Sequence, residues 1–195
     1  MAGRGAIAAR SSVLCVREAA RTLGLELDSV VYAVDGFGDA GSRAARYMSE
    51  LGSKMVACDD FVGGAYNPRG MDPTDVAAWK SRRGTVKGYP GSVDIRADDL
   101  FALPVNVVVA AGLPNALTEE VALKVSAGIV VEAVEGPVSP AAEEILRSRG
   151  VMVIPDLLSV DPAFSNLSWT AEEVDARLEK IVADWFTKVF ECRKR

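Results

Sequence analysis

Three glycines in the stretch VVYAVDGFGDAG, residues 30–41, have the spacing of a phosphate-binding turn. In a G-x-G-x-x-G turn between a strand and a helix, the first glycine makes the tight turn. The second lets the backbone approach a pyrophosphate, and the third lets the helix pack on the strand. The N–H groups of the first helical turn then face the anion. This stretch therefore predicts a dinucleotide site built on Gly36, Phe37, Gly38, Ala40 and Gly41.

An acid at the end of the next predicted strand completes this pattern. Asp60 follows Gly36 at a separation close to the roughly 20 residues expected for the acid that binds a ribose hydroxyl. Its charge would repel the 2′-phosphate of NADP, so Asp60 favours NAD as the cofactor. Asp59 is a competing candidate for the same role.

Two further acids oppose this interpretation. Asp35 and Asp39 put carboxylates where the pyrophosphate would arrive. At an effective dielectric between protein surface and water, a carboxylate about 5 Å from a phosphate costs on the order of 1–3 kcal/mol. Arg43 could offset part of that cost. The pattern thus predicts a nucleotide site that is weakened but not abolished, and the alternative is a turn that is glycine-rich for packing alone.

Composition excludes several kinds of chemistry. The chain has no histidine, which removes the commonest general base and the commonest metal ligand. Cys15, Cys58 and Cys192 form no C-x-x-C pair, and we expect reduced thiols. A net charge of -5 argues against nucleic acid as a partner. No apolar run reaches the roughly 20 residues needed to span a bilayer, and no signal peptide is recognised, so we expect a cytoplasmic protein without a membrane contact.

Alternating helical and strand patterns surround the glycine turn. They predict an α/β fold of the Rossmann type, a doubly wound and mostly parallel sheet with helices on both faces. Residues 63–72 and 82–94 are predicted as turns and loops. The predicted helices cover 7–23, 42–51, 73–83, 118–125 and 139–149, and the predicted strands cover 30–34, 55–58, 105–109, 129–131 and 151–154.

A last helix is predicted over residues 170–193. Thr170 and Glu173 have the spacing of a capping box at its start. Its apolar stripe is broad enough to need a partner surface, either in this domain or in another chain. The whole chain is expected to form one domain, which the helix 1–24 opens and the helix 170–193 closes.

With the glycine turn and the following strand read together, the sequence resembles the cofactor-binding domain of the glutamate dehydrogenases, whose wider class includes leucine, phenylalanine and valine dehydrogenases. The resemblance covers nearly the whole chain in order. It is carried by GRGAIAARSSVLCVREAARTLG (3–24), the segment 30–70, KGYPGSVDI (87–95), VVVAAGLPNALTEEVA (107–122), the segment 129–158 and the segment 169–191.

The resemblance implies oxidative deamination of an amino acid, with hydride passing to NAD(P). In this family the catalytic lysines and aspartate belong to an N-terminal substrate domain with a motif close to PxGGxKGG. The 195 residues hold no such motif, so no catalytic residue can be assigned. A separate substrate-domain chain is a possible partner, and a homo-oligomer is expected.

The segments that would face the nicotinamide differ from the family pattern. VEGANGP appears as VEAVEGP with Glu135, PAALEN appears as AAGLPN with Pro114, and the stretch after PDLL is shortened to SVDPAFSNLSW. Glu132 is predicted to be a structural carboxylate rather than a ligand-binding one. The predicted cofactor contacts are Gly36, Phe37, Gly38, Asp39, Ala40, Gly41, Asp59, Asp60, Ala110, Ala111, Gly112, Asn115 and Glu135, and no metal site is predicted.

Three functions remain open at this point. The chain can be the cofactor half of an amino-acid dehydrogenase. It can be a non-catalytic domain that binds a nucleotide as a sensor or regulatory subunit. It can also be an oligomerisation module whose nucleotide site has decayed, since loss of a substrate domain uncovers apolar surface that self-association would cover.

Overall fold

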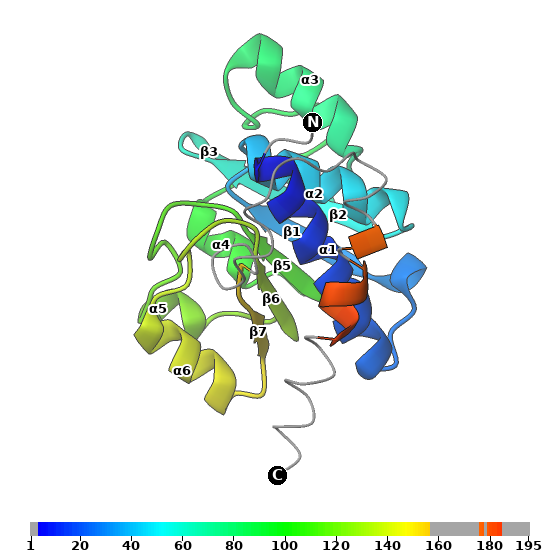
Figure 1. Cartoon of the computed structure of the whole chain (residues 1–195). Coiled ribbons are helices and arrows are strands. Elements are labelled where there is room, and N and C mark those ends of the chain that lie inside the picture. Colours follow the sequence, from blue (N-terminus) through cyan, green and yellow to red (C-terminus); the bar gives the residue numbers. More distant parts are fainter. Residues whose placement is uncertain (1–3, 157–175, 178, 185–195) are drawn as a thin grey trace.

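The computed structural model describes residues 4–156, 176–177 and 179–184. In this part of the chain a seven-stranded sheet has the order β4-β3-β2-β1-β5-β6-β7. Figure 1 shows the strands from β3 to β7 in this order. The neighbouring strands β2, β1, β5, β6 and β7 run parallel to one another. At the other end of the sheet, β3 pairs antiparallel with both β2 and β4. The strands are β1 Val31–Asp35, β2 Lys54–Asp60, β3 Gly63–Tyr66, β4 Val93–Ile95, β5 Val107–Ala110, β6 Ile129–Glu132 and β7 Met152–Ile154.

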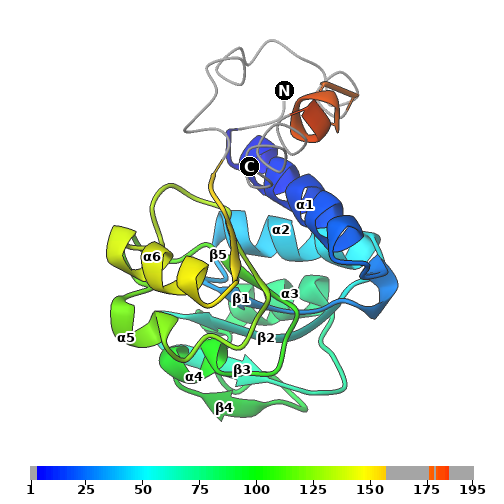
Figure 2. The same ribbon diagram turned by 90° about the horizontal axis from the view of Figure 1, so that it is seen from below.

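Helices cover both faces of the sheet (Figure 2). One apolar core joins α1, α2 and α3 to one face, and a second core joins α4, α5 and α6 to the other. Neighbouring strand residues alternate between these cores, because successive side chains of a strand point to opposite faces. The helices are α1 Arg4–Thr22, α2 Asp39–Glu50, α3 Pro73–Arg83, α4 Ala97–Phe101, α5 Glu119–Ala122 and α6 Pro140–Ser148, with a 3-10 turn at Leu27–Ser29.

The strand order reverses at β1, which has β2 on one side and β5 on the other. In an open α/β sheet, the loops that leave the carboxyl ends of the strands diverge at such a point and create a crevice. The glycine turn at 36–41 follows β1 directly and leads into α2. The fold therefore places the predicted phosphate-binding turn at the edge of this crevice.

The predicted fold class is confirmed, and the main elements lie within a few residues of their predicted bounds. The predicted helix 7–23 ends at Thr22, and Gly24 adopts a φ of +70° directly after it. Leu23, which directly follows the helix, is 49% exposed. The described part of the predicted last helix, residues 176–177 and 179–184, is helical, and Val182 packs into the first core. The rest of 170–193 lies outside the described residues.

The interpretation of residues 63–72 and 82–94 as loops is partly wrong. Gly63–Tyr66 forms β3, and the end of the second stretch belongs to β4. Glycine weakens a strand pattern, so the pair Gly63-Gly64 conceals this strand in the sequence. The strand needs a glycine there, since a Cβ on Gly64 would lie 2.8 Å from Cγ1 of Ile95.

Candidate functional site

The first and third glycines of the turn are fixed by close packing. Gly36 has a φ of +80°, and a Cβ on it would lie 2.5 Å from the carbonyl oxygen of Ala111. A Cβ on Gly41 would lie 2.3 Å from the carbonyl oxygen of Gly36. Gly38 is different, because its Cβ position has no heavy atom within 4 Å. The turn is thus held together at both ends and left open at its middle glycine, where a ligand would approach.

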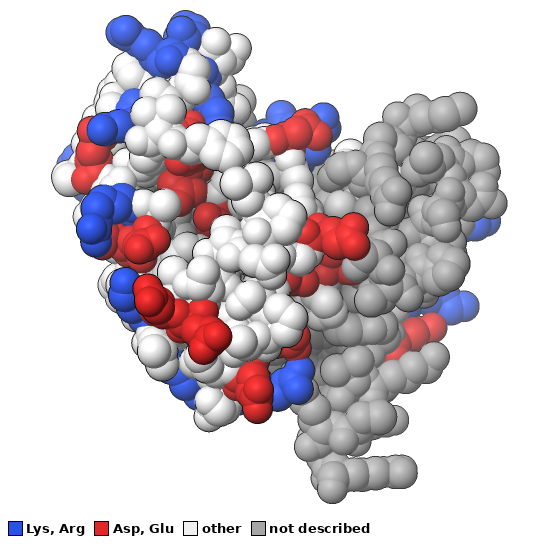
Figure 3. Space-filling view, turned by 90° about the vertical axis from the view of Figure 1, so that its left-hand side faces the viewer, with Lys and Arg blue, Asp and Glu red and all other residues white. Residues whose placement is uncertain are grey.

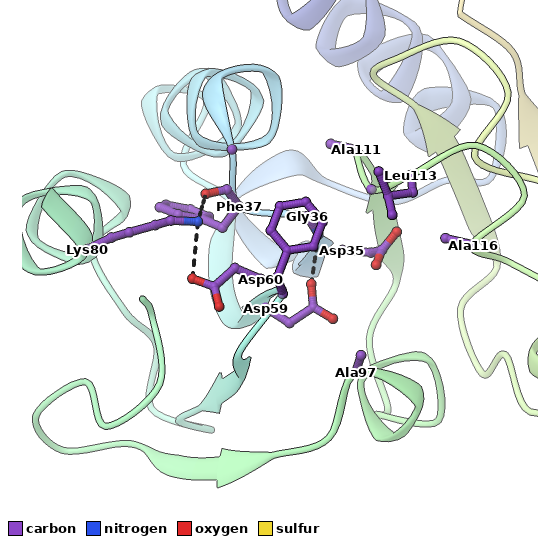
Figure 4. Close-up of a pocket in the computed structure, with 13 residues that line it drawn as sticks. Asp35, Gly36, Phe37, Asp59, Asp60, Lys80, Ala97, Ala111, Leu113 and Ala116 are labelled. Carbon is purple, nitrogen blue, oxygen red and sulfur yellow. Dashed lines mark hydrogen bonds and ion pairs between the residues drawn. The ribbon is translucent and has the colours of Figure 1, made fainter. Parts of the chain in front are cut away.

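A cavity of about 370 Å³ opens beside this turn (Figure 4). Its walls come from the ends of β1 and β2, from α3 and α4, and from the loop after β5. It therefore lies at the point where the strand order reverses, where open α/β sheets bind their ligands. The lining residues are Asp35, Gly36, Phe37, Gly38, Asp59, Asp60, Phe61, Lys80, Ala97, Ala111, Gly112, Leu113 and Ala116.

Several backbone N–H groups of the turn already have partners. The N–H of Gly36 donates to Oδ1 of Asp59 at 2.7 Å, and the N–H of Phe37 donates to the carbonyl oxygen of Asp59 at 2.7 Å. The N–H of Gly38 donates to the carbonyl oxygen of Gly36. The amides of the first turn of α2, which begins at Asp39, therefore remain for an anion, as at any helix start.

Asp39 lies at the start of α2 and is ion-paired. Its Oδ1 accepts from the guanidinium of Arg43 at 2.9 Å, one helical turn later, and its side chain is 72% exposed. Arg43 is the residue predicted to offset part of the electrostatic cost of this acid, and that effect on a ligand stays a prediction. An exposed ion pair of this kind contributes little to stability.

Asp60 is held by four donors, and its side chain is 5% exposed. Oδ1 accepts from the N–H of Val62 and the hydroxyl of Thr85, and Oδ2 accepts from the N–H of Val86 and from Nζ of Lys80 at 3.1 Å. Burial alone would raise the pKa of Asp60, but these hydrogen bonds together hold it below its usual value. A ribose hydroxyl would have to displace one of the four donors, so the ribose-binding role of Asp60 stays a prediction.

Asp35 and Asp59 are two further buried acids of the cavity, 7% and 2% exposed. The pKa of Asp59 is raised to about 8, mainly by burial and to a smaller extent by the negative charge of Asp35. Burial likewise raises the pKa of Asp35 to about 6, and the backbone N–H of Gly112 acts against this rise. Oδ2 of Asp35 is buried and has no hydrogen-bond partner among the described residues.

The structure brings seven of the predicted contacts together in the cavity wall and leaves the others outside it. Asp39, Ala40 and Gly41 form the first turn of α2, directly after the lining residue Gly38, and do not line the cavity themselves. Ala110 is buried at the end of β5. Asn115 and Glu135 are exposed on the loops after β5 and β6. These loops lie side by side, since the N–H of Asn115 donates to the carbonyl oxygen of Gly136. The seven residues in the wall are Gly36, Phe37, Gly38, Asp59, Asp60, Ala111 and Gly112.

Sequence reasoning missed five side chains of the cavity. Phe61 at the end of β2 is 88% exposed, and Leu113 after β5 is 58% exposed. Nζ of Lys80, from α3, donates to the carbonyl oxygen of Phe37 at 2.9 Å as well as binding Asp60. In the sequence, Phe61 could have been recognised as an apolar residue that directly follows Asp60, the predicted ribose-binding acid. Lys80, Ala97 and Ala116 carry no local signal, because distant elements bring them to the cavity.

Glu132 lies at the end of β6, away from the cavity. Its Oε1 accepts from the N–H of Val138 at 3.1 Å, and burial raises its pKa while this hydrogen bond lowers it. The carbonyl oxygen of Glu132 also accepts from the hydroxyl of Ser12 in α1. These contacts join β6 to the loop that follows it and to α1, which favours the structural role.

The face drawn in Figure 3 carries charged side chains of both signs. Figure 3 shows basic side chains gathered over α3, whose last turn carries Lys80, Arg82 and Arg83, and acidic side chains spread over the rest of that face. In the described part of the chain, no helix is long and apolar enough to cross a membrane. The same residues contain no cluster of three His, Cys, Asp or Glu side chains that could hold a metal ion.

Comparison with known proteins identifies the family of this chain. The family model described as Glutamate/Leucine/Phenylalanine/Valine dehydrogenase matches residues 1–195. The chain belongs to this family. It is 36% identical to the NADP-specific glutamate dehydrogenase A1 of Halobacterium salinarum, over 94% of this chain and 47% of that protein. It is 32% identical to the cryptic catabolic NAD-specific glutamate dehydrogenase of Bacillus subtilis, over 97% of this chain and 47% of that protein.

A solved structure of a glutamate dehydrogenase is also similar to this chain. The hetero-hexameric glutamate dehydrogenase from Thermus thermophilus, in its leucine-bound form, superposes with a TM-score of 0.81 at 30% identity. The match covers 94% of this chain and 46% of that chain. The chain thus spans about half the length of the dehydrogenases that it matches.

Proposed function

We propose that this chain is the cofactor-binding domain of an amino-acid dehydrogenase of this family, folded as one domain, and that its cavity binds a nicotinamide dinucleotide. The observation that carries the proposal is the packing of the turn. Gly36 and Gly41 are locked in place, while Gly38 faces open space at the reversal of the strand order. Fold maintenance alone explains the first two glycines and does not require the third.

The reaction that we propose for the complete enzyme is oxidative deamination of an amino acid, with glutamate as the first substrate to test. This chain supplies the site that holds the cofactor and excludes water from one side of it. It supplies no candidate for the base that would take a proton from the amino acid, because the PxGGxKGG motif is absent. A substrate domain, on a partner chain or on further sequence, would complete the cleft, and the assembly would be an oligomer.

NAD rather than NADP stays the predicted cofactor, on the negative charge of Asp60 at the end of β2. Lys80 places a positive charge 3.1 Å from that carboxylate, so the two charges act in opposite directions on a 2′-phosphate. The relatives named above include both an NADP-specific and an NAD-specific enzyme. Parallel titrations with NADH and NADPH decide between the two cofactors.

A non-catalytic nucleotide-binding or oligomerisation module is the second candidate. The observation in its favour is that Asp59 occupies the N–H of Gly36, in a cavity that also holds the buried carboxyl of Asp35. In such a module the turn would serve the fold, and binding would be weak or lost.

The test is a fluorescence titration of the purified chain with NADH, beside Gly38→Ala. Because the Gly38 backbone has an ordinary φ of -91° and its Cβ position is open, the variant should fold normally. We expect saturable NADH binding by the chain and binding weakened at least about tenfold in the variant, since a methyl group would occupy the approach to the pyrophosphate. Equal affinities, or no saturation at millimolar NADH, would contradict the proposal.

Addition of glutamate and NAD to the chain alone should give no NADH. Production of NADH by the pure chain would show that it carries its own catalytic groups, and the assignment as a cofactor domain would then be wrong.

A further inference from the structure

Two carboxyl groups approach the cavity from neighbouring strands at the position where a pyrophosphate would bind. Asp35 is the last residue of β1, and Asp59 lies near the end of the adjacent β2. Both line the cavity (Figure 4), and both are more than nine-tenths buried. A dinucleotide carries its charge on the pyrophosphate, so these carboxyls and the ligand compete for the same region.

The two groups differ in their hydrogen bonds. Asp59 has a fixed orientation, because its Oδ1 accepts from the N–H of Gly36 at 2.7 Å. Asp35 has an oxygen, Oδ2, with no partner among the described residues, although Gly112 lies so close that a Cβ there would be 2.6 Å from that oxygen. A buried oxygen without a donor is costly as a carboxylate and cheaper as a hydroxyl that can donate into the cavity.

The charged groups around the pair do not neutralise it. On β2, the charge of Asp60 disfavours ionisation of Asp59, and the thiol of Cys58 is its other neighbour. From α3, Lys80 favours ionisation, but its Nζ is bound to Asp60 and to the carbonyl oxygen of Phe37. On α2, Asp39 is paired with Arg43. On α4, next to Ala97 in the cavity wall, lie the exposed Asp98 and Asp99.

Resting on the proposed function, we propose that Asp35 and Asp59 act as one proton-holding pair that determines whether the site accepts the ligand, and that the dinucleotide binds together with a proton on this pair. A proton lowers the negative charge that faces the pyrophosphate. When the proton lies on Asp35, it also gives the unpartnered oxygen of that residue a hydrogen to donate into the cavity. The two carboxyls are thus specificity-determining residues, because an anion enters only the protonated site.

The pair titrates in the neutral range, which makes the proposal measurable. Since the pKa of Asp35 is raised to about 6 and that of Asp59 to about 8, the pair holds roughly one proton near pH 7. A bound pyrophosphate raises both values further. Linkage then requires that affinity falls as pH rises, by up to about tenfold per pH unit for one proton taken up.

The experiment measures the Kd for NADH from pH 6.5 to 9 with the full chain. NADH is the probe because its pyrophosphate has no titration in this range, whereas a phosphate monoester such as that of NADPH titrates near pH 6. Calorimetry at pH 8 in two buffers of different ionisation enthalpy counts the protons taken up on binding. We expect weaker binding at each higher pH and uptake of up to about one proton per NADH.

Asp59→Asn identifies the group responsible. The asparagine side chain keeps an Oδ1 acceptor for the N–H of Gly36, and residue 59 can no longer gain or lose a proton. We expect this variant to bind NADH at pH 9 about as tightly as the unaltered chain does at pH 6.5, with a flattened pH profile. Asp39→Asn is the matched control, since it removes an exposed acid beside the same turn. Its Kd should shift by a similar factor at every pH and keep the slope.

The outcomes separate this inference from the proposed function. Saturable NADH binding with the same Kd at pH 6.5 and 9 and no proton uptake overturns the proton-holding pair and leaves the dinucleotide site. Affinity that rises with pH, or an unchanged slope in Asp59→Asn, also overturns the pair. If Asp59→Asn does not fold, the proton count on the unaltered chain still decides. Failure of both proteins to bind NADH at any pH overturns the proposed function and the inference together.

Discussion

Gly36 lies directly against Ala111, so that a Cβ on the glycine would be 2.5 Å from the carbonyl oxygen of the alanine. This contact joins the turn after β1 to the loop after β5, the two segments that diverge from the reversal of the strand order. The N–H of Ala111 also donates to the carbonyl oxygen of Asp35 at 2.8 Å. The floor of the cavity is thus a backbone junction that leaves no room for a side chain on Gly36.

Gly36→Ala should destabilise the chain by about 2–4 kcal/mol. The methyl group would meet backbone atoms that cannot rotate away, and the φ of +80° is itself unfavourable for alanine. Chemical denaturation measures the change, and Gly38→Ala is the control. That variant should lose no more than about 1 kcal/mol, as expected for an alanine at a helix N-cap. Equal losses in both variants would show that the packing argument is wrong.

Asp39→Asn should tighten NADH binding by about 3- to 10-fold, because it removes a negative charge from the approach to the start of α2. The price in stability is about 0.3–1 kcal/mol, since an acid in the first turn of a helix interacts favourably with the helix dipole. Parallel fluorescence titration and thermal unfolding of the two proteins check both effects. Asp28→Asn, in the 3-10 turn before β1, should change neither the affinity nor its salt dependence. Weaker NADH binding by Asp39→Asn would contradict the electrostatic reading.

Much of the fold could be predicted because its signals are local. A β-branched run gives β1, and the glycines after α1 and α2 mark the ends of those helices. The strands β3 and β4 at one end of the sheet were missed, since their pairing is antiparallel and Gly64 of β3 is required by its close contact with Ile95. Local sequence does not carry a contact of that kind.

The site was predicted to a smaller extent than the fold. The spacing of the glycines indicated the turn, whereas Lys80 reaches the carbonyl oxygen of Phe37 from a helix 43 residues away in sequence. The predicted ribose acid Asp60 is in the cavity wall, but the four donors that hold it could not be seen from sequence. Asn115 and Glu135 are exposed and do not line the cavity, although Leu113 and Ala116 from the same loop as Asn115 do.

The free energy of unfolding should fall as pH rises from about 5 to 8. Asp59 has a folded pKa raised to about 8, so the folded chain retains a proton that the unfolded chain loses from about pH 4 upwards. Each pH unit in this window therefore lowers stability by at most about 1.4 kcal/mol per such group, and the loss ends above the folded pKa. Asp35 acts in the same direction up to about pH 6. Urea denaturation at pH 5.5, 7 and 8.5 follows the decline.

Two asparagine variants give opposite results in this measurement. Asp59→Asn should be more stable than the unaltered chain at pH 8.5 and should show a weaker pH dependence. Asp60→Asn should be less stable at all three pH values, by about 1–3 kcal/mol, because it weakens charged hydrogen bonds to Lys80 and Thr85. Stability that rises between pH 5.5 and 8.5 in the unaltered chain, with no difference between the variants, would contradict the assignment of the raised pKa to Asp59.

Phe61→Ala should weaken NADH binding without loss of stability. The ring is 88% exposed at the end of β2, so its removal leaves no cavity in the core, yet it lines the ligand cavity together with Leu113. An aromatic face of this kind contributes on the order of 1 kcal/mol when a flat ligand ring packs on it, which corresponds to about a fivefold change in Kd. Val62→Ala is the matched control, because Val62 is the next residue, is 61% exposed and does not line the cavity.

AMP should lose affinity in Phe61→Ala by the same factor as NADH if the adenine lies on this ring. Loss with NADH and none with AMP would place the nicotinamide there, and no loss with either ligand would exclude Phe61 from the site.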